Sequence, residues 1–129
     1  RSIESAYRHS PFFEYYIDEY APFFEKRFEY LLDFNAALLE VNLNALEINN
    51  AINYSEEFLI NGGKDHADYR DTIHPKKNHS SDPSFVPVAY QQVFAERHGF
   101  KANLSIIDLL FNEGPNARSV LEQCIAPPL

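Results

Sequence analysis

Apolar side chains recur every three or four residues from Phe12 to Ile48, a spacing that places them on one face of an α-helix. Three segments carry this pattern: the first follows Ser10 and Pro11, the second begins at Pro22, and the third begins at Asp33. A serine or aspartate cap and a proline in the first turn are typical of helix starts. The sequence therefore predicts three successive helices, of which the last ends near Ile48.

Residues 103–114, with the sequence NLSIIDLLFNEG, form a short apolar segment that has its own start and stop signals. Ser105 can cap a helix, and Asp108, three residues later, can complete a capping box. Gly114 can adopt the positive φ angle that ends a helix. On a helix Ser105, Asp108 and Asn112 share one face. The segment is either a capped core helix or the floor of a site, and we expect the rest of the chain to pack around it.

Two segments have the character of β-strands. Residues 51–55 follow a turn-prone asparagine pair and hold two large apolar side chains, and residues 88–94 (VAYQQVF) fit a second strand or an extended segment. The predicted fold class is therefore α/β, mostly helical with a small sheet. Tyr90 and Gln92 share one side of such a strand. A glutamine buried here either reads a sugar or an amide or belongs to an ordinary hydrogen-bond network, and an exposed sheet edge is the remaining alternative.

Residues 61–87 interrupt this pattern. They contain three prolines and three of the five histidines and have no periodicity of their own. A connection of this length inside a domain is either functional or disordered. Four of the 11 basic and four of the 19 acidic residues lie here, so the segment is neutral and the rest of the chain carries the whole net charge of −8. We therefore predict a long polar loop within a single domain.

Composition narrows the class of protein. The chain has 129 residues and is 45% hydrophobic, which is enough for one domain with a core. A net charge of −8 argues against general nucleic-acid binding and against adhesion to an anionic membrane. Cys124 is the only cysteine, so no internal disulfide can form and a reducing compartment is expected. No apolar run approaches the roughly 20 residues that cross a bilayer. The chain begins at Arg1 and contains no methionine, so we expect an upstream segment that is absent from this sequence.

One group of side chains in the polar loop has the chemistry of an anion site. Arginine grips a phosphate or carboxylate with two hydrogen bonds, lysine adds a point charge, and tyrosine can stack on a ring. A solvated loop whose cations pair with neighbouring aspartates is the alternative. The histidines match no metal-binding spacing, so no metal site is predicted, and no Walker loop or nucleophile elbow is present. The group consists of Tyr69, Arg70, His74, Lys76 and Lys77.

Five stretches of the chain together resemble the WbqC-like family. They are SIESAYRHSPFFEYY at 2–16, LLDFN at 31–35, DYRDTIHPKK at 68–77, YQQVF at 90–94 and HGFKANLSIIDLLFNEG at 98–114. The resemblance covers most of the chain, and the last stretch is its most specific part. Family members usually carry a strand-rich segment before the position of Ser2. The resemblance therefore implies that residues 1–129 are the C-terminal part of a larger single domain.

The resemblance also implies a bacterial protein linked to O-antigen and surface-polysaccharide gene clusters. Our hypothesis is a cytoplasmic transferase that modifies an amino sugar on a nucleotide carrier, and it names no cofactor. Tyr69, Arg70, Lys76 and Lys77 would hold a phosphate-bearing donor. The acceptor side would be lined by Tyr90, Gln92, Asp108 and Asn112, with Ser105 beside them. His74 or Asp108 would take the catalytic proton.

A second hypothesis is a non-catalytic binding or scaffold protein of a glycan-assembly complex. The first three predicted helices are rich in aromatic residues, which are enriched at protein interfaces. Exposure of Phe12, Phe23 and Phe28 as one patch would favour this hypothesis. Their burial would favour an enzyme or a plain globular domain.

Overall fold

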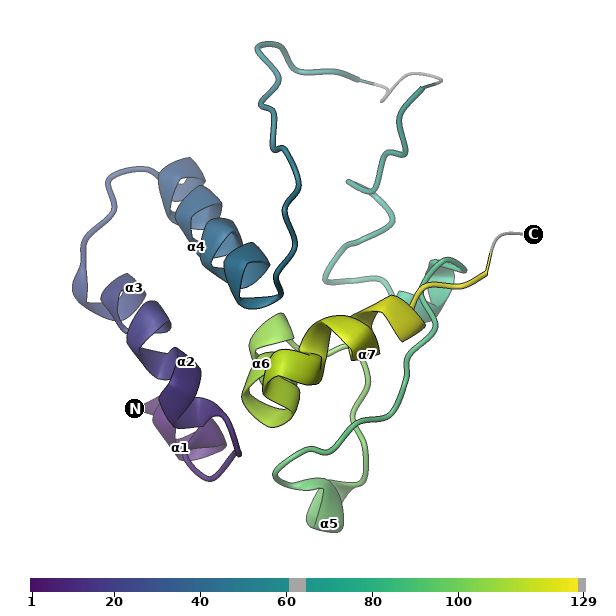
Figure 1. Cartoon of the computed structure of the whole chain (residues 1–129). Coiled ribbons are helices and arrows are strands. Elements are labelled where there is room, and N and C mark those ends of the chain that lie inside the picture. The colour runs from purple at the N-terminus through teal and green to yellow at the C-terminus, as the bar shows by residue number, and fades with distance from the viewer. Residues whose placement is uncertain (61–64, 128–129) are drawn as a thin grey trace.

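The computed structural model describes residues 1–60 and 65–127, which are helical with long irregular connections (Figure 1). Residues 61–64, the first four of the predicted loop 61–87, lie outside the described part. Helix α6 contacts α2, α4 and α7, so it lies between the N-terminal helices and the C-terminal one. In order, the helices are α1 (Ser2–Tyr7), α2 (Phe13–Tyr20), α3 (Pro22–Glu25), α4 (Leu31–Ala45), the 3-10 turn η1 (His79–Ser81), α5 (Ala95–His98), α6 (Ile106–Glu113), the 3-10 turn η2 (Gly114–Asn116) and α7 (Ala117–Gln123).

The predicted small sheet is wrong, and with it the α/β fold class. Within residues 1–60 and 65–127 the β-structure is limited to one isolated antiparallel bridge, between Phe85 and Ile125. Residues 51–55 are exposed and belong to no regular element. Residues 88–94 begin as an irregular segment without a partner strand and turn at their C-terminal end. The helical part of the prediction fits.

A side chain takes the place of the missing partner strand. The Gln92 side-chain amide donates to the Lys101 carbonyl at 2.8 Å and accepts from the Lys101 backbone N–H at 2.9 Å. This pair reproduces the two-bond exchange that a neighbouring strand makes. Because Gln92 satisfies the backbone of Lys101 in this way, the chain turns back on itself here instead of building a ladder.

Helix boundaries differ from the predicted ones by a few residues. Helix α2 begins at Phe13, because Ser10 turns its hydroxyl back to donate to the Tyr7 carbonyl at 2.5 Å instead of capping the helix. Helix α4 begins two residues before Asp33, with Tyr30 in the capping position, and ends at Ala45. The segment at 103–114 forms α6 as predicted, with Ser105 in the capping position.

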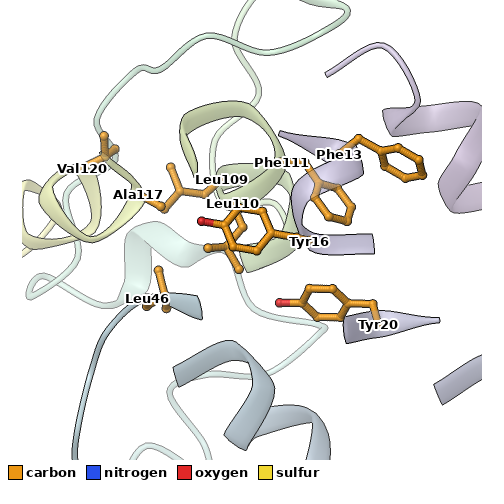
Figure 2. Close-up of a cluster of buried hydrophobic side chains, with 9 residues drawn as sticks. All are labelled: Phe13, Tyr16, Tyr20, Leu46, Leu109, Leu110, Phe111, Ala117 and Val120. Carbon is orange, nitrogen blue, oxygen red and sulfur yellow. The ribbon is translucent and has the colours of Figure 1, made fainter. Parts of the chain in front are cut away.

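The core is built around Phe111, which is fully buried on α6. Its ring makes edge-to-face contacts with Tyr7, Phe13 and Tyr20, at centroid distances of 5.1, 5.4 and 6.0 Å. Figure 2 shows Phe13, Tyr20 and Phe111 converging between α6 and the N-terminal helices. Aromatic pairs in this geometry add to the free energy of area burial. Through Phe111, the core fixes α1 and α2 against α6.

The phenylalanines of the scaffold hypothesis do not form one exposed patch. Phe12, Phe23 and Phe28 are all half-buried. Phe23 and Phe28 stack with ring centroids 5.8 Å apart, and both contact Phe34 edge to face. The ring of Phe12 faces Gly114 instead. These side chains therefore pack within the chain. The exposed aromatic patch that would have favoured a scaffold protein is not formed by these three residues.

Gly114 is required where α6 ends. Its φ angle is +54°, and a Cβ atom built on it would lie 2.5 Å from ring atoms of Phe12. An alanine at this position would adopt a positive φ angle at a cost in energy, and its Cβ atom would clash with the Phe12 ring. The backbone of Phe12 cannot easily move away, because its N–H donates to the Phe111 carbonyl at 2.9 Å. We expect Gly114→Ala to lower the free energy of unfolding by about 2–3 kcal/mol. Gly99→Ala is the control for urea denaturation, because Gly99 also has a positive φ angle but open space around it; equal losses would contradict the clash.

Tyr20 makes the free energy of unfolding depend on pH in the alkaline range. Burial, followed by the charges of Glu19 and Tyr16, raises the pKa of the Tyr20 phenol to about 12, and its hydroxyl donates to Asn42 Oδ1 at 2.6 Å. In the unfolded chain this phenol loses its proton near its ordinary pKa of about 10. The stabilisation is therefore complete below pH 10 and is lost as the pH rises to 12, by up to about 1.4 kcal/mol per pH unit. Between pH 10 and 12 the free energy of unfolding of Tyr20→Phe should fall less steeply than that of the wild type; parallel urea-denaturation curves would contradict this.

Candidate functional site

The candidate site is centred on Asp108, a carboxylate in the first turn of α6 whose residue is 5% exposed. Its Oδ2 atom accepts a hydrogen bond from the Tyr90 hydroxyl at 2.5 Å and another from Gln92 Nε2 at 3.1 Å. No capping box forms, because Ser105 makes no side-chain cap bond and meets Asp108 only through a backbone hydrogen bond of 2.9 Å. The carboxylate therefore faces the 90–92 segment rather than its own helix start.

Two local contacts hold the donors in place. The pair of hydrogen bonds between Gln92 and the backbone of Lys101 fixes the Gln92 amide, so its remaining N–H points at Asp108. The ring of Tyr90 packs edge to face against Phe100, with centroids 5.3 Å apart. Both contacts close the turn between residues 90 and 101, and that turn carries the donors to the side of α6.

Tyr7 completes the surroundings of the carboxylate. Burial raises the pKa of Tyr7 to about 12, and the negative charge of Asp108 and a hydrogen bond to it add to the increase. Burial also raises the pKa of Tyr90, with the hydrogen bond to Asp108 as the next cause, while a hydrogen bond with Gln92 opposes it. Both phenols therefore remain protonated at neutral pH and serve as donors.

Asp108 has no cationic partner among residues 1–60 and 65–127. The three ion pairs of this part join Arg1 to Glu4, Arg70 to Asp68 and Arg118 to Glu122. A carboxylate that loses its water costs several kcal/mol unless hydrogen bonds or an opposite charge replace the water. Neutral donors supply the hydrogen bonds here, whereas no side chain of the described residues supplies the charge at ion-pair distance.

The carboxylate opens on a cavity of about 230 Å³. Tyr7, Gln92 and Asp108 form its polar wall, and Leu104 forms part of its apolar wall. Lys101 and His98 line it from exposed positions. The cavity therefore combines the buried Asp108 carboxylate with apolar surface, an exposed lysine and an exposed histidine. Such a lining suits a small ligand that is polar at one end.

Asn112 contacts the backbone of Asp108 from the next turn of α6. The residue is 5% exposed, and its Nδ2 atom donates to the Asp108 carbonyl at 2.7 Å, one helical turn back. Its Oδ1 atom is buried and has no hydrogen-bond partner within the described part of the chain. Asn112 is absent from the wall of the Asp108 cavity. It contacts the backbone of Asp108, and its predicted role in binding substrate stays a prediction.

The structure divides the predicted site residues into two groups. Tyr90, Gln92 and Asp108 are joined by hydrogen bonds, whereas Ser105 is exposed and lines two neighbouring cavities instead. In the polar loop His74 and Lys77 line another cavity, and Tyr69 and Lys76 are exposed outside it. The roles assigned to all of these residues stay predictions.

Arg70 is occupied within the loop. It pairs with Asp68 at 2.5 Å and donates to the Leu59 carbonyl at 2.6 Å, and its guanidinium lies 5.7 Å from the centre of the Phe58 ring. A guanidinium bound in this way ties the loop to residues 58–59, which precede it. An anion competing for Arg70 would have to displace Asp68.

Sequence reasoning did not place Tyr7, His98 or Lys101 at this site. Tyr7 reaches Asp108 because the Tyr7 ring packs against Phe111, which lies on the same helix as Asp108. No local sequence pattern predicts this tertiary contact. Lys101 is tied to the site through its backbone. The usable signal was Gln92, a polar side chain in an apolar segment, since such a group must find partners when it is buried.

The chain belongs to the WbqC-like protein family, whose sequence model matches residues 1–81. Membership suggests a protein related to polysaccharide biosynthesis. Tyr7 lies within the matched residues and Asp108 lies beyond them. No curated protein and no solved structure matches the chain.

Two further features bear on the kind of site. Within residues 1–60 and 65–127, no group of histidine, cysteine and carboxylate side chains is arranged to hold a metal ion. In the same residues, every helix is too short or too polar to cross a membrane.

Proposed function

We propose that the protein is a transferase of bacterial surface-polysaccharide assembly that modifies the amine of an amino sugar on a nucleotide carrier. The Asp108 cavity binds the amine. The observation that carries this proposal is a buried carboxylate that faces a cavity and has no cationic partner among the described residues.

An ammonium group supplies what this carboxylate lacks. Its positive charge offsets the desolvation of Asp108, and its N–H groups can donate to the carboxylate. A hydroxyl or an N-acetyl group brings a donor without the charge, so the site favours the free amine over the acylated one. The cavity volume of about 230 Å³ lies below the range of roughly 300–1,000 Å³ that is usual for drug-sized ligands, and it suits a single sugar ring.

The same geometry can activate the amine. Asp108 takes one proton from the ammonium, and the neutral amine then attacks the electrophilic carbon of an activated donor such as a thioester. The C–N bond forms, the bond between that carbon and its leaving group breaks, and the second amine proton leaves with the departing group. Tyr7 and Tyr90 keep their own protons and hold the carboxylate in place.

Binding of glucosamine tests the proposal, with N-acetylglucosamine as the matched ligand without a charge. At about 100 times its dissociation constant a ligand raises the free energy of unfolding by about 2.7 kcal/mol, which thermal denaturation resolves. Glucosamine should stabilise the protein and N-acetylglucosamine should not. Equal effects of the two sugars, or no effect of either, would remove the basis for an amine site.

Turnover is tested by mass spectrometry. A nucleotide-linked amino sugar is incubated with the protein and one of several acyl donors, and the sugar is examined for the mass of the added group. The expected product appears with one donor class and is absent with Asp108→Asn. A product that forms equally well with Asp108→Asn would assign the proton transfer to another group.

A further inference from the structure

A second cavity, of about 470 Å³, lies between the polar loop and the start of the α6 segment. We propose that it binds the phosphate groups of a small-molecule diphosphate, with the nucleoside diphosphate of an activated sugar as the ligand class. This inference rests on the proposed function, because that function calls for a nucleotide carrier. The residues that carry it are His74, Lys77, His79, Asp82, Phe85 and Asn103.

One wall of this cavity is anchored to the C-terminal helix. Phe85 forms the isolated bridge with Ile125, directly after α7. On either side of Phe85 the backbone is held by two more hydrogen bonds, from the Val86 N–H to the Cys124 carbonyl at 2.8 Å and from the Ala126 N–H to the Ser84 carbonyl at 2.9 Å. Because Cys124 is buried, this wall is fixed to the folded body of the protein.

The opposite wall presents two donors for an anion. The Lys77 N–H donates to the His74 carbonyl at 2.9 Å, which makes a tight turn, and the Lys76 N–H donates to His74 Nδ1 at 3.1 Å. A neutral imidazole that accepts at Nδ1 carries its proton on Nε2, so His74 keeps a donor for a ligand oxygen. Lys77 contributes an ammonium, the usual point charge for phosphate.

The lysine of this cavity, Lys77, forms no ion pair within the described residues. The one acidic side chain on the wall, Asp82, points its Oδ1 atom back to its own loop, where it accepts from the Ser84 N–H at 2.9 Å and from the Ser84 hydroxyl at 2.5 Å. The cationic side chain available to a ligand is therefore Lys77, with His74 and His79 beside it, while Asp82 is hydrogen-bonded within its own loop.

Phe85 adds an apolar surface to the same cavity. Its ring packs edge to face against His79, with centroids 5.9 Å apart, and the cavity extends along it. A base or sugar ring can cover such a surface while the phosphates reach Lys77. We therefore expect a nucleoside diphosphate to bind more tightly than pyrophosphate.

The two proposed sites are linked through shared walls. The phosphate cavity shares Phe85 and Asn103 with an apolar cavity of about 180 Å³, and that cavity shares Leu104 with the Asp108 cavity. The cavity lined by Lys77 and the cavity lined by Asp108 thus both border the same apolar cavity. A ligand with a diphosphate at one end and an amine at the other has the complementary order of charges.

Adjacent lysines provide a matched test. Lys77 lines the cavity and Lys76 does not, although both are exposed, so each alanine variant removes the same charge with little effect on folding. Isothermal titration with pyrophosphate and with UDP is expected to give at least about tenfold weaker binding for Lys77→Ala, which corresponds to about 1.4 kcal/mol. Binding by Lys76→Ala should change by less than about twofold. Equal losses in the two variants, or no binding of either ligand at about 10 mM, would overturn the proposal.

A third variant separates this inference from the proposed function. Asp108→Asn should bind pyrophosphate as the wild type does, because Asp108 lies outside the phosphate cavity. If pyrophosphate binds through Lys77 and glucosamine does not bind, the phosphate site stands and the amine transferase fails. If glucosamine binds and neither phosphate ligand does, the phosphate site is refuted and the amine site stands.

Discussion

Replacing Asp108 by asparagine is expected to abolish most amino-sugar binding and leave the fold almost unchanged. Asparagine can still accept from Tyr90 and Gln92, so the free energy of unfolding should change by less than about 1 kcal/mol. It cannot offer a charge to an ammonium, and hydrogen bonds to charged groups are worth about 1.5–3 kcal/mol. We therefore expect affinity for glucosamine to fall at least tenfold, as measured by titration calorimetry.

The pair of measurements separates a ligand-binding role from a structural one. Asp18→Asn is the control for the loss of one negative charge, because Asp18 is exposed on α2 and the substitution removes the same charge. If Asp108 served only the stability of the fold, the substitution would leave the affinity for glucosamine unchanged. Urea denaturation showing a loss above about 2 kcal/mol, together with unchanged glucosamine affinity, would assign it that structural role.

Truncating Phe111 to alanine is expected to be the most destabilising change in the protein. Its side chain is fully buried and packs against three aromatic rings, and removing a buried phenylalanine costs about 3–5 kcal/mol. Phe24→Ala makes the same chemical change at a position that is 70% exposed, and its effect should stay within about 0.5 kcal/mol. Urea denaturation of both variants measures the difference, and comparable losses would mean that α6 is not the centre of the core.

The same core positions the candidate site. Tyr7 touches Phe111 on one side and interacts with Asp108 on the other, so the packing of α1 against α6 sets one wall of the cavity. Asn112 holds the backbone of Asp108 from the next turn of α6. The geometry of the site is thus a consequence of how the hydrophobic face of α6 is buried.

The helices could be predicted because their signals are local. Helices α2, α4 and α6 show apolar side chains at helical spacing, and Gly114 ends α6 with a positive φ angle as expected. Helix α1 was not predicted. The sheet could not be excluded locally, because residues 88–94 have the composition of a strand. What decided against it is the pairing of a side chain, Gln92, with the backbone of Lys101, a contact that strand patterns do not encode.

The candidate site was foreseen only in part, for a related reason. Tyr90, Gln92 and Asp108 stand out as polar residues in apolar segments, and such residues must find each other or solvent when they are buried. The structure brings these three together. The place of Tyr7 depends on tertiary packing, and the loop cations depend on the path of the 65–87 backbone, neither of which has a sequence signature.

The most direct test of the account is an NMR titration that follows the side-chain amide of Gln92, whose Nε2 atom donates to Asp108 at 3.1 Å. An ammonium bound to this carboxylate must change the electrostatic surroundings of that amide. The account predicts a saturable shift of the Gln92 amide resonances with glucosamine and no shift with N-acetylglucosamine at the same concentration. Resonances that do not move with glucosamine, or that move equally with both sugars, would contradict the claim that Asp108 binds a cationic amine.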